Sequence, residues 1–110
     1  MHLEMQNAGD INRVVKPIRV SETTEMQDLK DAIMAEVSKY GMALVDTFGE
    51  NTNYTTANAF ILARGHAQSY GVDLTSKLSY VNLKLEDEIK IGIRWKITVE
   101  GDLDKLRESK

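Results

Sequence analysis

The sequence predicts a single α/β domain, a two-layer sandwich of one sheet and two helices. The chain has 110 residues, of which 42% are apolar, so it can build one core but not two. Two segments place apolar residues every three or four positions, which is typical of amphipathic helices. The last third alternates apolar and polar residues, as half-buried strands do. The expected order is strand, helix, strand, helix, strand, strand over residues 13–101, between an N-terminal arm (1–12) and a charged tail (102–110) that has room for one helical turn.

The first predicted strand is a short apolar run that contains Val14, Val15, Ile18 and Val20. Pro17, the only proline, lies inside this run and has no N–H to donate to a neighbouring strand. We therefore expect an edge strand or a strand with a bulge.

The first helix is predicted from Met26 to Tyr40, because apolar residues recur there at helical spacing and Gly41 ends the pattern. The hydroxyl residues at positions 21, 23 and 24 are expected to cap its N-terminus. Acidic residues crowd the first turns, where the helix dipole favours negative charge, so they need no metal or catalytic role to explain them. They are Glu22, Glu25, Asp28 and Asp31.

A second strand is predicted from Met42 to Phe48, followed by a polar loop from Gly49 to Thr56. Thr55 or Thr56 can cap a second helix, which is expected to end near Tyr70 and Gly71. The amide and hydroxyl groups of the loop precede a helix N-terminus, an arrangement that can hold an anion or a small polar ligand.

The last two strands are predicted to form a hairpin with its turn at Glu86-Asp87-Glu88. This turn places the apolar residues of both strands on one face, in the pairs Leu85–Ile89, Leu83–Ile91 and Val81–Ile93. The same register puts Lys84 opposite Lys90 and Tyr80 opposite Arg94 on the other face. We therefore expect a basic stripe with one aromatic residue, made of Tyr80, Lys84, Lys90, Arg94 and Lys96.

Charge and composition exclude several classes of function. The 14 Lys and Arg residues are outnumbered by 17 Asp and Glu, a net charge of −3, so any surface for nucleic acid must be local. The absence of cysteine excludes disulfides, thiolate zinc sites and a cysteine nucleophile. Neither a signal peptide nor a run of ~20 apolar residues is visible, so we expect a cytoplasmic protein with no membrane association. A core this small favours self-association.

Four segments are more specific than these patterns: Ile18–Ser21, Ala59–Gly65, Gly71–Leu74 and the closing strand Ile91–Glu100. Through these segments and the predicted order of strands and helices, the chain resembles the stage V sporulation protein S family over residues 18–101. The resemblance implies an Alba-like β-α-β-α-β-β fold, in which one four-stranded mixed sheet carries two helices on one face. It also implies a dimer or tetramer, binding of DNA or RNA, a bacterial or phage source, and no enzymatic activity.

Alba-like proteins place basic residues in the loop before the first helix and on the final hairpin, where they straddle the nucleic-acid backbone. The corresponding loop here, residues 21–25, is acidic and would repel phosphate. The hairpin does match through the basic stripe, although three acids lie at its tip. The resemblance therefore implies nucleic-acid binding by the stripe, whereas the residues alone favour the solvated face that antiparallel hairpins commonly have.

A second hypothesis is an oligomeric module that binds a small polar or nucleotide-like ligand, or a protein partner. Its candidate residues, in the polar loop or at a subunit interface, are Asn51, Asn53, Tyr54, Thr55 and Arg64. Catalysis is not expected, because no serine or threonine has a histidine partner and the acids are explained by caps and turns. His66 stands alone apart from His2 in the arm, so neither a metal nor another cofactor is expected.

Overall fold

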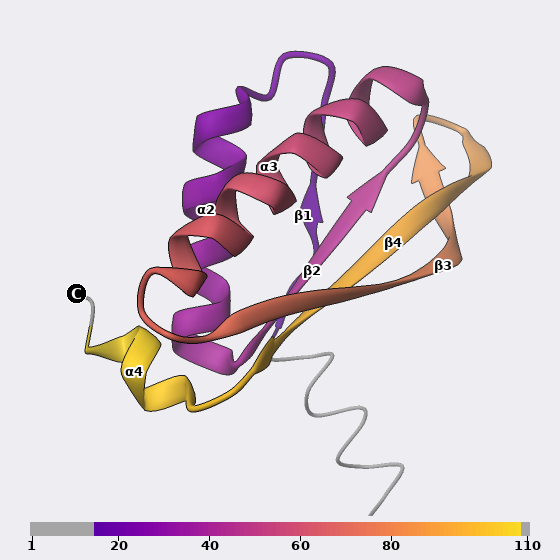
Figure 1. Cartoon of the computed structure of the whole chain (residues 1–110). Coiled ribbons are helices and arrows are strands. Elements are labelled where there is room, and N and C mark those ends of the chain that lie inside the picture. The colour runs from indigo at the N-terminus through magenta and orange to yellow at the C-terminus, as the bar shows by residue number, and fades with distance from the viewer. Residues whose placement is uncertain (1–14, 109–110) are drawn as a thin grey trace, which may run out of the picture.

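A computed structural model describes residues 15–108, so the predicted arm and Val14 lie outside the described residues. Its elements are β1 (Ile18–Arg19), α2 (Met26–Tyr40), β2 (Met42–Thr47), α3 (Glu50–Gln68), β3 (Asp73–Leu85), β4 (Glu88–Glu100) and α4 (Leu103–Arg107). The strands form one four-stranded mixed sheet in the order β1-β2-β4-β3, with β1 at an edge as predicted. The pairing of β1 with β2 is parallel and the other two pairings are antiparallel. Helices α2 and α3 pack together on one face of the sheet (Figure 1), which confirms the predicted fold class.

The core lies between the two helices and the sheet face that they cover. Helix α3 contributes three fully buried alanines, at positions 59, 63 and 67, whose small side chains let the helix lie close to its neighbours. The helix α2 residues Leu29, Ile33 and Val37 recur every four positions and are also fully buried. The sheet completes the core with Ala43, Val45, Leu74, Trp95 and Ile97.

Helix α2 has the predicted bounds, but its N-terminus is not capped as predicted. Gly41 adopts the left-handed conformation, with φ of 77°, and its N–H donates to the carbonyl oxygen of Val37 at 2.9 Å. The N-cap is Glu25, whose side chain makes no capping hydrogen bond. Thr24 instead closes a turn ahead of the helix, because its Oγ1 accepts a hydrogen bond from the Ser21 N–H at 2.9 Å. The predicted hydroxyl cap is therefore wrong.

The polar segment predicted as a loop forms the first turns of α3, which begins at Glu50 rather than after a cap at Thr55 or Thr56. Its hydroxyl groups bond to carbonyls one turn earlier: Thr52 Oγ1 donates to the oxygen of Phe48 at 2.8 Å. Thr56 Oγ1 donates to the oxygen of Thr52, also at 2.8 Å. Such bonds satisfy polar side chains inside a helix, so a composition that is typical of a loop is compatible with helix here.

Strands β3 and β4 form one long hairpin whose register differs from the predicted one by a single residue. Glu86 and Asp87 make a two-residue turn, so that Leu85 pairs with Glu88 and Lys84 pairs with Ile89. Glu86 has φ of 58°, a conformation for which glycine or asparagine is the usual sequence signal. Because successive residues of a strand point to opposite faces, the shift separates the apolar residues that were expected to share one face.

The two faces of the hairpin have different environments. Trp95 and Ile97 of β4 point toward the helices and join the core. On the opposite face Leu83 is only 2% exposed and lies beside Gly92. A Cβ at Gly92 would stand 2.3 Å from the carbonyl oxygen of Thr47, so the glycine allows β4 to pass close to the end of β2.

The charged tail contains the expected helical turn, α4, which packs against the end of α2. Leu106 is fully buried. Arg107 donates from Nε to the carbonyl oxygen of Ser38 at 2.8 Å and from Nη2 to that of Lys39 at 3.1 Å. These carbonyls belong to the last turn of α2, where they have no partners within the helix. Across residues 15–108, no helix combines the length and apolarity needed to cross a membrane.

Candidate nucleic-acid interface

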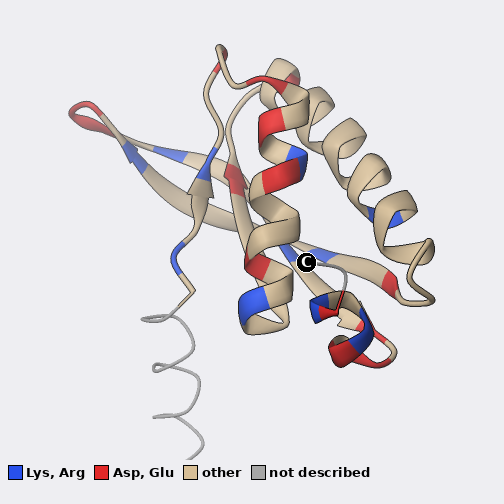
Figure 2. Ribbon diagram, turned by 90° about the vertical axis from the view of Figure 1, so that its left-hand side faces the viewer, with Lys and Arg blue, Asp and Glu red and all other residues tan. Residues whose placement is uncertain are grey.

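The sheet face that points away from the helices carries a group of basic residues. Arg19 of β1 is in register with Asp46 of β2, and Asp46 is in register with Arg94 of β4, so these three residues form one row across the sheet. Lys96 and Lys77 form a second row on the same face, and Figure 2 shows the basic segments of β1 and the hairpin. We call this surface the basic face and define it by Arg19, Lys77, Lys90, Arg94 and Lys96.

Lys77 and Lys96 lie directly opposite each other across β3 and β4. Two like charges in such a pair destabilise a sheet. Within residues 15–108, neither ammonium group forms an ion pair with an acid. Phosphates bound by the two ammonium groups would offset this repulsion with attraction, so the pair favours a polyanionic partner.

Arg94 forms an ion pair within the chain. Its Nε and Nη2 each donate to one carboxylate oxygen of Asp46 at 2.8 Å. The Asp46 side chain is 3% exposed and that of Arg94 is 31% exposed. The hydrogen bond to Asp46, with the charge of the carboxylate, raises the pKa of Arg94. Arg94 therefore holds a buried carboxylate in place. Because this carboxylate largely neutralises the charge of Arg94, the residue contributes little to the attraction of a phosphate.

The structure brings together only part of the predicted stripe. Lys90, Arg94 and Lys96 lie on the basic face, where Lys90 Nζ is 3.4 Å from a carboxylate oxygen of Glu88. Lys84 and Tyr80 lie on the opposite face of the hairpin, in register with Ile89 and Ile93. The predicted pairings of Lys84 with Lys90 and of Tyr80 with Arg94 are wrong, because the turn has two residues and not three.

The prediction omitted two residues of the basic face, Lys77 and Arg19. A two-residue turn at Glu86 and Asp87 would have placed Lys77 opposite Lys96, but no glycine marks that turn in the sequence. Arg19 reaches this face through the parallel pairing of β1 with β2, which no local sequence signal specifies.

Acidic residues limit the basic face at both ends. Glu86, Asp87 and Glu88 form the tip of the hairpin, visible in Figure 2. Asp73 pairs with Glu100 at the other end of the hairpin. A bound polyanion would therefore be confined to the middle of the sheet.

Arg64, a candidate of the second hypothesis, forms a bidentate ion pair within the chain. Its Nε is 2.7 Å from Oδ1 of Asp73 and its Nη2 is 3.0 Å from Oδ2. The hydrogen bond from Arg64 is the main cause that lowers the pKa of Asp73, and the same bond raises the pKa of Arg64. The pair ties the last part of α3 to the first residue of β3.

We predict that Arg64→Gln lowers the melting temperature at neutral pH but not in strong acid. Because the pKa of Asp73 is lower in the folded protein, the pair stabilises the fold fully above the ordinary Asp pKa of about 3.9. The effect disappears as the pH falls through the lower, folded-state pKa. Thermal unfolding of both proteins in a pH series measures it, and a difference that stays constant down to the lowest pH would contradict the assignment.

The remaining candidates of the second hypothesis belong to the first turns of α3. Asn51 Nδ2 donates to Oε1 of Glu22 at 3.0 Å, and Asn53 Oδ1 accepts from the hydroxyl of Thr47. Tyr54 is largely exposed, and Thr55 is half-buried. The two amides thus hold the start of α3 against the loop after β1 and the end of β2.

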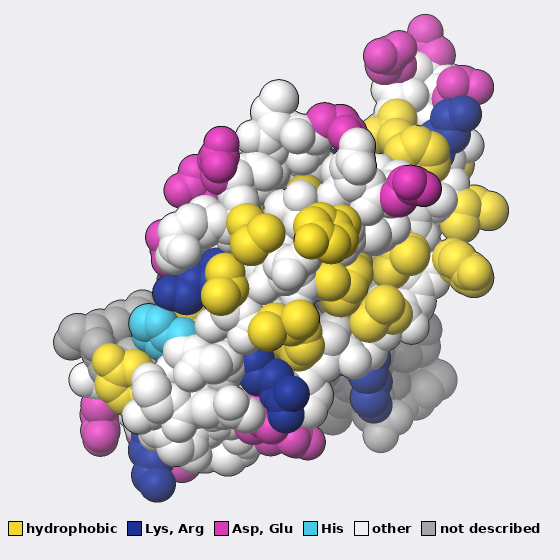
Figure 3. Space-filling model, turned by 45° about the horizontal axis from the view of Figure 1, so that its top comes forward, with side chains coloured by type: hydrophobic (Ala, Val, Ile, Leu, Met, Phe, Trp, Pro, Cys, Tyr) yellow, Lys and Arg dark blue, Asp and Glu magenta, His cyan; other side chains and the backbone are white. Residues whose placement is uncertain are grey.

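A second surface of the molecule is apolar and exposed. Part of the hairpin projects past the helices, and there four large apolar side chains on the helix-facing side are each more than half exposed. Figure 3 shows apolar side chains gathered over α3 and the hairpin. Exposed apolar area of this kind marks an interaction site. We call it the apolar face and define it by Ile61 of α3 with Leu78, Tyr80, Ile89 and Ile91 of the hairpin.

Comparison with protein families gives a match that includes all four strands and both packed helices. The family model of stage V sporulation protein S (SpoVS) matches residues 16–100. The chain belongs to this family. Membership confirms the resemblance seen in the sequence and supports a sporulation-related regulatory role for this SpoVS-family protein. No curated protein gives a significant match to the chain.

The matched segment of the SpoVS family contains the whole basic face and the whole apolar face, and it ends before α4. Both surfaces therefore belong to the part of the chain that defines the family.

Proposed function

We propose that this SpoVS-family protein is a non-enzymatic, Alba-like regulator that binds the phosphate backbone of DNA or RNA through its basic face. We also propose that it assembles with copies of itself, as a dimer or tetramer, through its apolar face. The observation that carries the nucleic-acid proposal is the cross-strand pair of Lys77 and Lys96, which has no acidic partner among the described residues.

A solvated strand face accounts for isolated charges but not for two lysines that face each other. The one buried acid of this face, Asp46, is bonded by Arg94 and cannot offset them. Arg19 adds a third cation without an ion-pair partner among residues 15–108. Three such cations on one face of the sheet can attract the phosphate backbone, and electrostatic contact is the usual basis of binding without sequence preference.

The chemistry of the basic face favours backbone contact over base recognition. Between its acidic ends, the hairpin positions of this face carry Lys, Arg, Ser, Thr, Gly and aliphatic residues, and neither Asn nor Gln. Side-chain amides are among the main groups that read base edges by paired hydrogen bonds. We therefore infer that the protein positions or coats nucleic acid rather than selecting a sequence.

The test is fluorescence anisotropy of labelled duplex DNA, single-stranded DNA and RNA at low and physiological salt. The double variant Lys77→Glu, Lys96→Glu is expected to weaken binding at least about tenfold. Lys84→Glu is the control for position, since it makes one such charge reversal on the opposite face of the same hairpin, half the charge change of the double variant. Little change is expected for this control. Equal loss in both variants, or no binding by the wild type at low salt, would contradict the proposal.

Self-association is supported by the exposed apolar face, whose large side chains are each more than half exposed. A two-fold dimer presents the same patch from both subunits, so one apolar face suffices to make a closed interface. Covering it would add buried apolar area to a chain that buries little by itself.

The oligomer proposal predicts that Ile91→Lys converts the protein to a monomer, because a charge at the centre of the apolar face would have to be desolvated. Light scattering after size exclusion measures the mass. Ser79→Lys is the control, since Ser79 is exposed on the other face of the hairpin. A wild-type protein that is monomeric at every concentration would refute self-association.

A further inference from the structure

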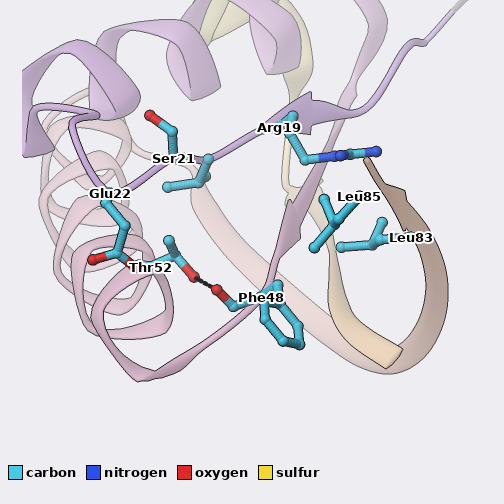
Figure 4. Close-up of a pocket in the computed structure, with 8 residues that line it drawn as sticks. Arg19, Ser21, Glu22, Phe48, Thr52, Leu83 and Leu85 are labelled. Atoms are coloured by element: carbon cyan, nitrogen blue, oxygen red, sulfur yellow. Dashed lines mark hydrogen bonds between the residues drawn. The ribbon is translucent and has the colours of Figure 1, made fainter. Parts of the chain in front are cut away.

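A pocket of about 430 Å³ lies where the parallel strands β1 and β2 end, at the Arg19 end of the basic face and apart from the Lys77 and Lys96 pair. Such a volume is typical of small-molecule sites, which run from about 300 to 1,000 Å³. Figure 4 shows Arg19 on one side and Phe48 on the opposite side, with the hairpin leucines between them. The lining residues are Arg19, Val20, Ser21, Glu22, Phe48, Thr52, Leu83 and Leu85.

The fold itself leaves this pocket open. Strands β1 and β2 both lead into helices on one face of the sheet (Figure 1), so neither of these helices covers the opposite face where the two strands end. The third wall comes from the hairpin, which carries Leu83 and Leu85 on the side away from the helices. The hairpin can approach β2 because Gly92 has no side chain to meet the Thr47 carbonyl.

The interior surface of the pocket is apolar. Val20, Leu83 and Leu85 form walls, and the ring of Phe48, which is 43% exposed, adds apolar surface. An apolar group placed between Phe48 and the leucines would remove this area from water.

Most polar groups of the rim already have partners within the chain. The Thr52 hydroxyl donates to the carbonyls of Phe48 and Gly49, and Glu22 accepts from the amide of Asn51. The guanidinium of Arg19 has no ion-pair partner among the described residues, because its register neighbour Asp46 is bonded by Arg94. A ligand in this pocket can therefore contact apolar surface and one guanidinium that has no ion-pair partner among the described residues.

We propose that this pocket binds a small amphipathic carboxylate. Its apolar chain or ring packs between Phe48 and the two leucines, and its carboxylate pairs with the planar fork of Arg19. A single negative charge fits better than a phosphate dianion, because the Glu22 carboxylate lies on the same rim. This site goes beyond the proposed function: it shares Arg19 with the basic face, but its ligand is distinct from nucleic acid.

The test uses octanoate as the probe, with octanol as the same chain without charge and acetate as the same charge without the chain. Titration of ¹⁵N-labelled protein is expected to give saturable amide shifts at residues 20–22, 48–52 and 83–85. Octanol is expected to bind about tenfold more weakly than octanoate, since it lacks the charge-assisted hydrogen bonds. Acetate is expected to give no saturable shift.

Arg19→Gln is expected to reduce the affinity for octanoate to that for octanol, whereas Lys16→Gln, in the exposed segment before β1, leaves it unchanged. Shifts confined to the apolar face, or an octanoate affinity that Arg19→Gln does not change, would overturn the proposal. Failure here is separable from failure of nucleic-acid binding, because that binding is tested on Lys77 and Lys96 with a different ligand.

Discussion

Replacing Gly92 by alanine is expected to destabilise the protein by about 3 kcal/mol, the upper part of the usual range for overpacking. The added Cβ would stand 2.3 Å from the Thr47 carbonyl oxygen and 2.6 Å from Cδ1 of Leu83. The leucine could rotate away, but the carbonyl belongs to β2 and can move only with the strand. The hairpin would have to separate from the end of β2, which would also open the wall of the pocket.

Urea denaturation followed by the fluorescence of Trp95, the only tryptophan, measures this loss. The matched control is Gly65→Ala, because a Cβ at this helical position meets no atom within 4 Å. Alanine there should stabilise α3 by up to about 1 kcal/mol, since glycine is a poor helix former. Equal stability of the Gly92 variant and the wild type would show that β4 does not pass as close to β2 as described.

Replacing Arg94 by leucine is expected to cost about 3 to 5 kcal/mol of folding free energy. Arg94 supplies a hydrogen bond to each oxygen of the Asp46 carboxylate, and the Asp46 side chain is 3% exposed. Without Arg94, a buried charge is left with no counter-ion. Water would have to enter the sheet to solvate the carboxylate.

Replacing Arg94 and replacing Asp46 should lower the folding free energy by different amounts. This difference distinguishes the cost of a buried, unpaired charge from the loss of a single contact. Asp46→Leu leaves Arg94, which can reach water because 31% of its side chain is exposed, so it should cost less than Arg94→Leu. The double variant should recover much of the stability. A double-mutant cycle in urea measures the coupling. An Arg94→Leu variant within about 0.5 kcal/mol of the wild type would contradict the role given to the pair.

The features that the sequence predicts well are those with strong local signals. Helix α2 has apolar residues at helical spacing and a glycine at its end, and its predicted bounds are those of the structure. The hairpin is indicated by alternation over both strands, and the family assignment rests on segments distributed along the domain.

Features that depend on contacts between residues far apart in the sequence cannot be predicted from local patterns. Glu86 adopts a conformation that its residue type does not signal, so the sequence pattern places the turn one residue away from its true position and Lys84 on the wrong face. Helix α3 begins earlier than its loop-like composition predicts, and Thr52 and Thr56 are satisfied there by bonds to the backbone of the preceding turn. Arg19 joins the basic face only through the partner strand of β1.

The two proposed surfaces lie on opposite faces of one hairpin, so both can be occupied at once. An assembly formed through the apolar faces would present two or more basic faces to the same polyanion. Linked sites of this kind bind far more tightly than each site alone, provided that the geometry lets them engage together. A weak, local basic face on an acidic protein can then suffice for a regulatory protein.

The central claim is that Lys77 and Lys96 each bind a phosphate, and the salt dependence of binding tests it most directly. The logarithm of the duplex affinity is measured against the logarithm of the salt concentration, for the wild type and for Lys77→Gln, Lys96→Gln. The slope should fall in magnitude by about 2, because each phosphate that a lysine neutralises adds about 0.9. An unchanged slope, with or without a change in affinity, would show that phosphate binds elsewhere and would contradict the claim.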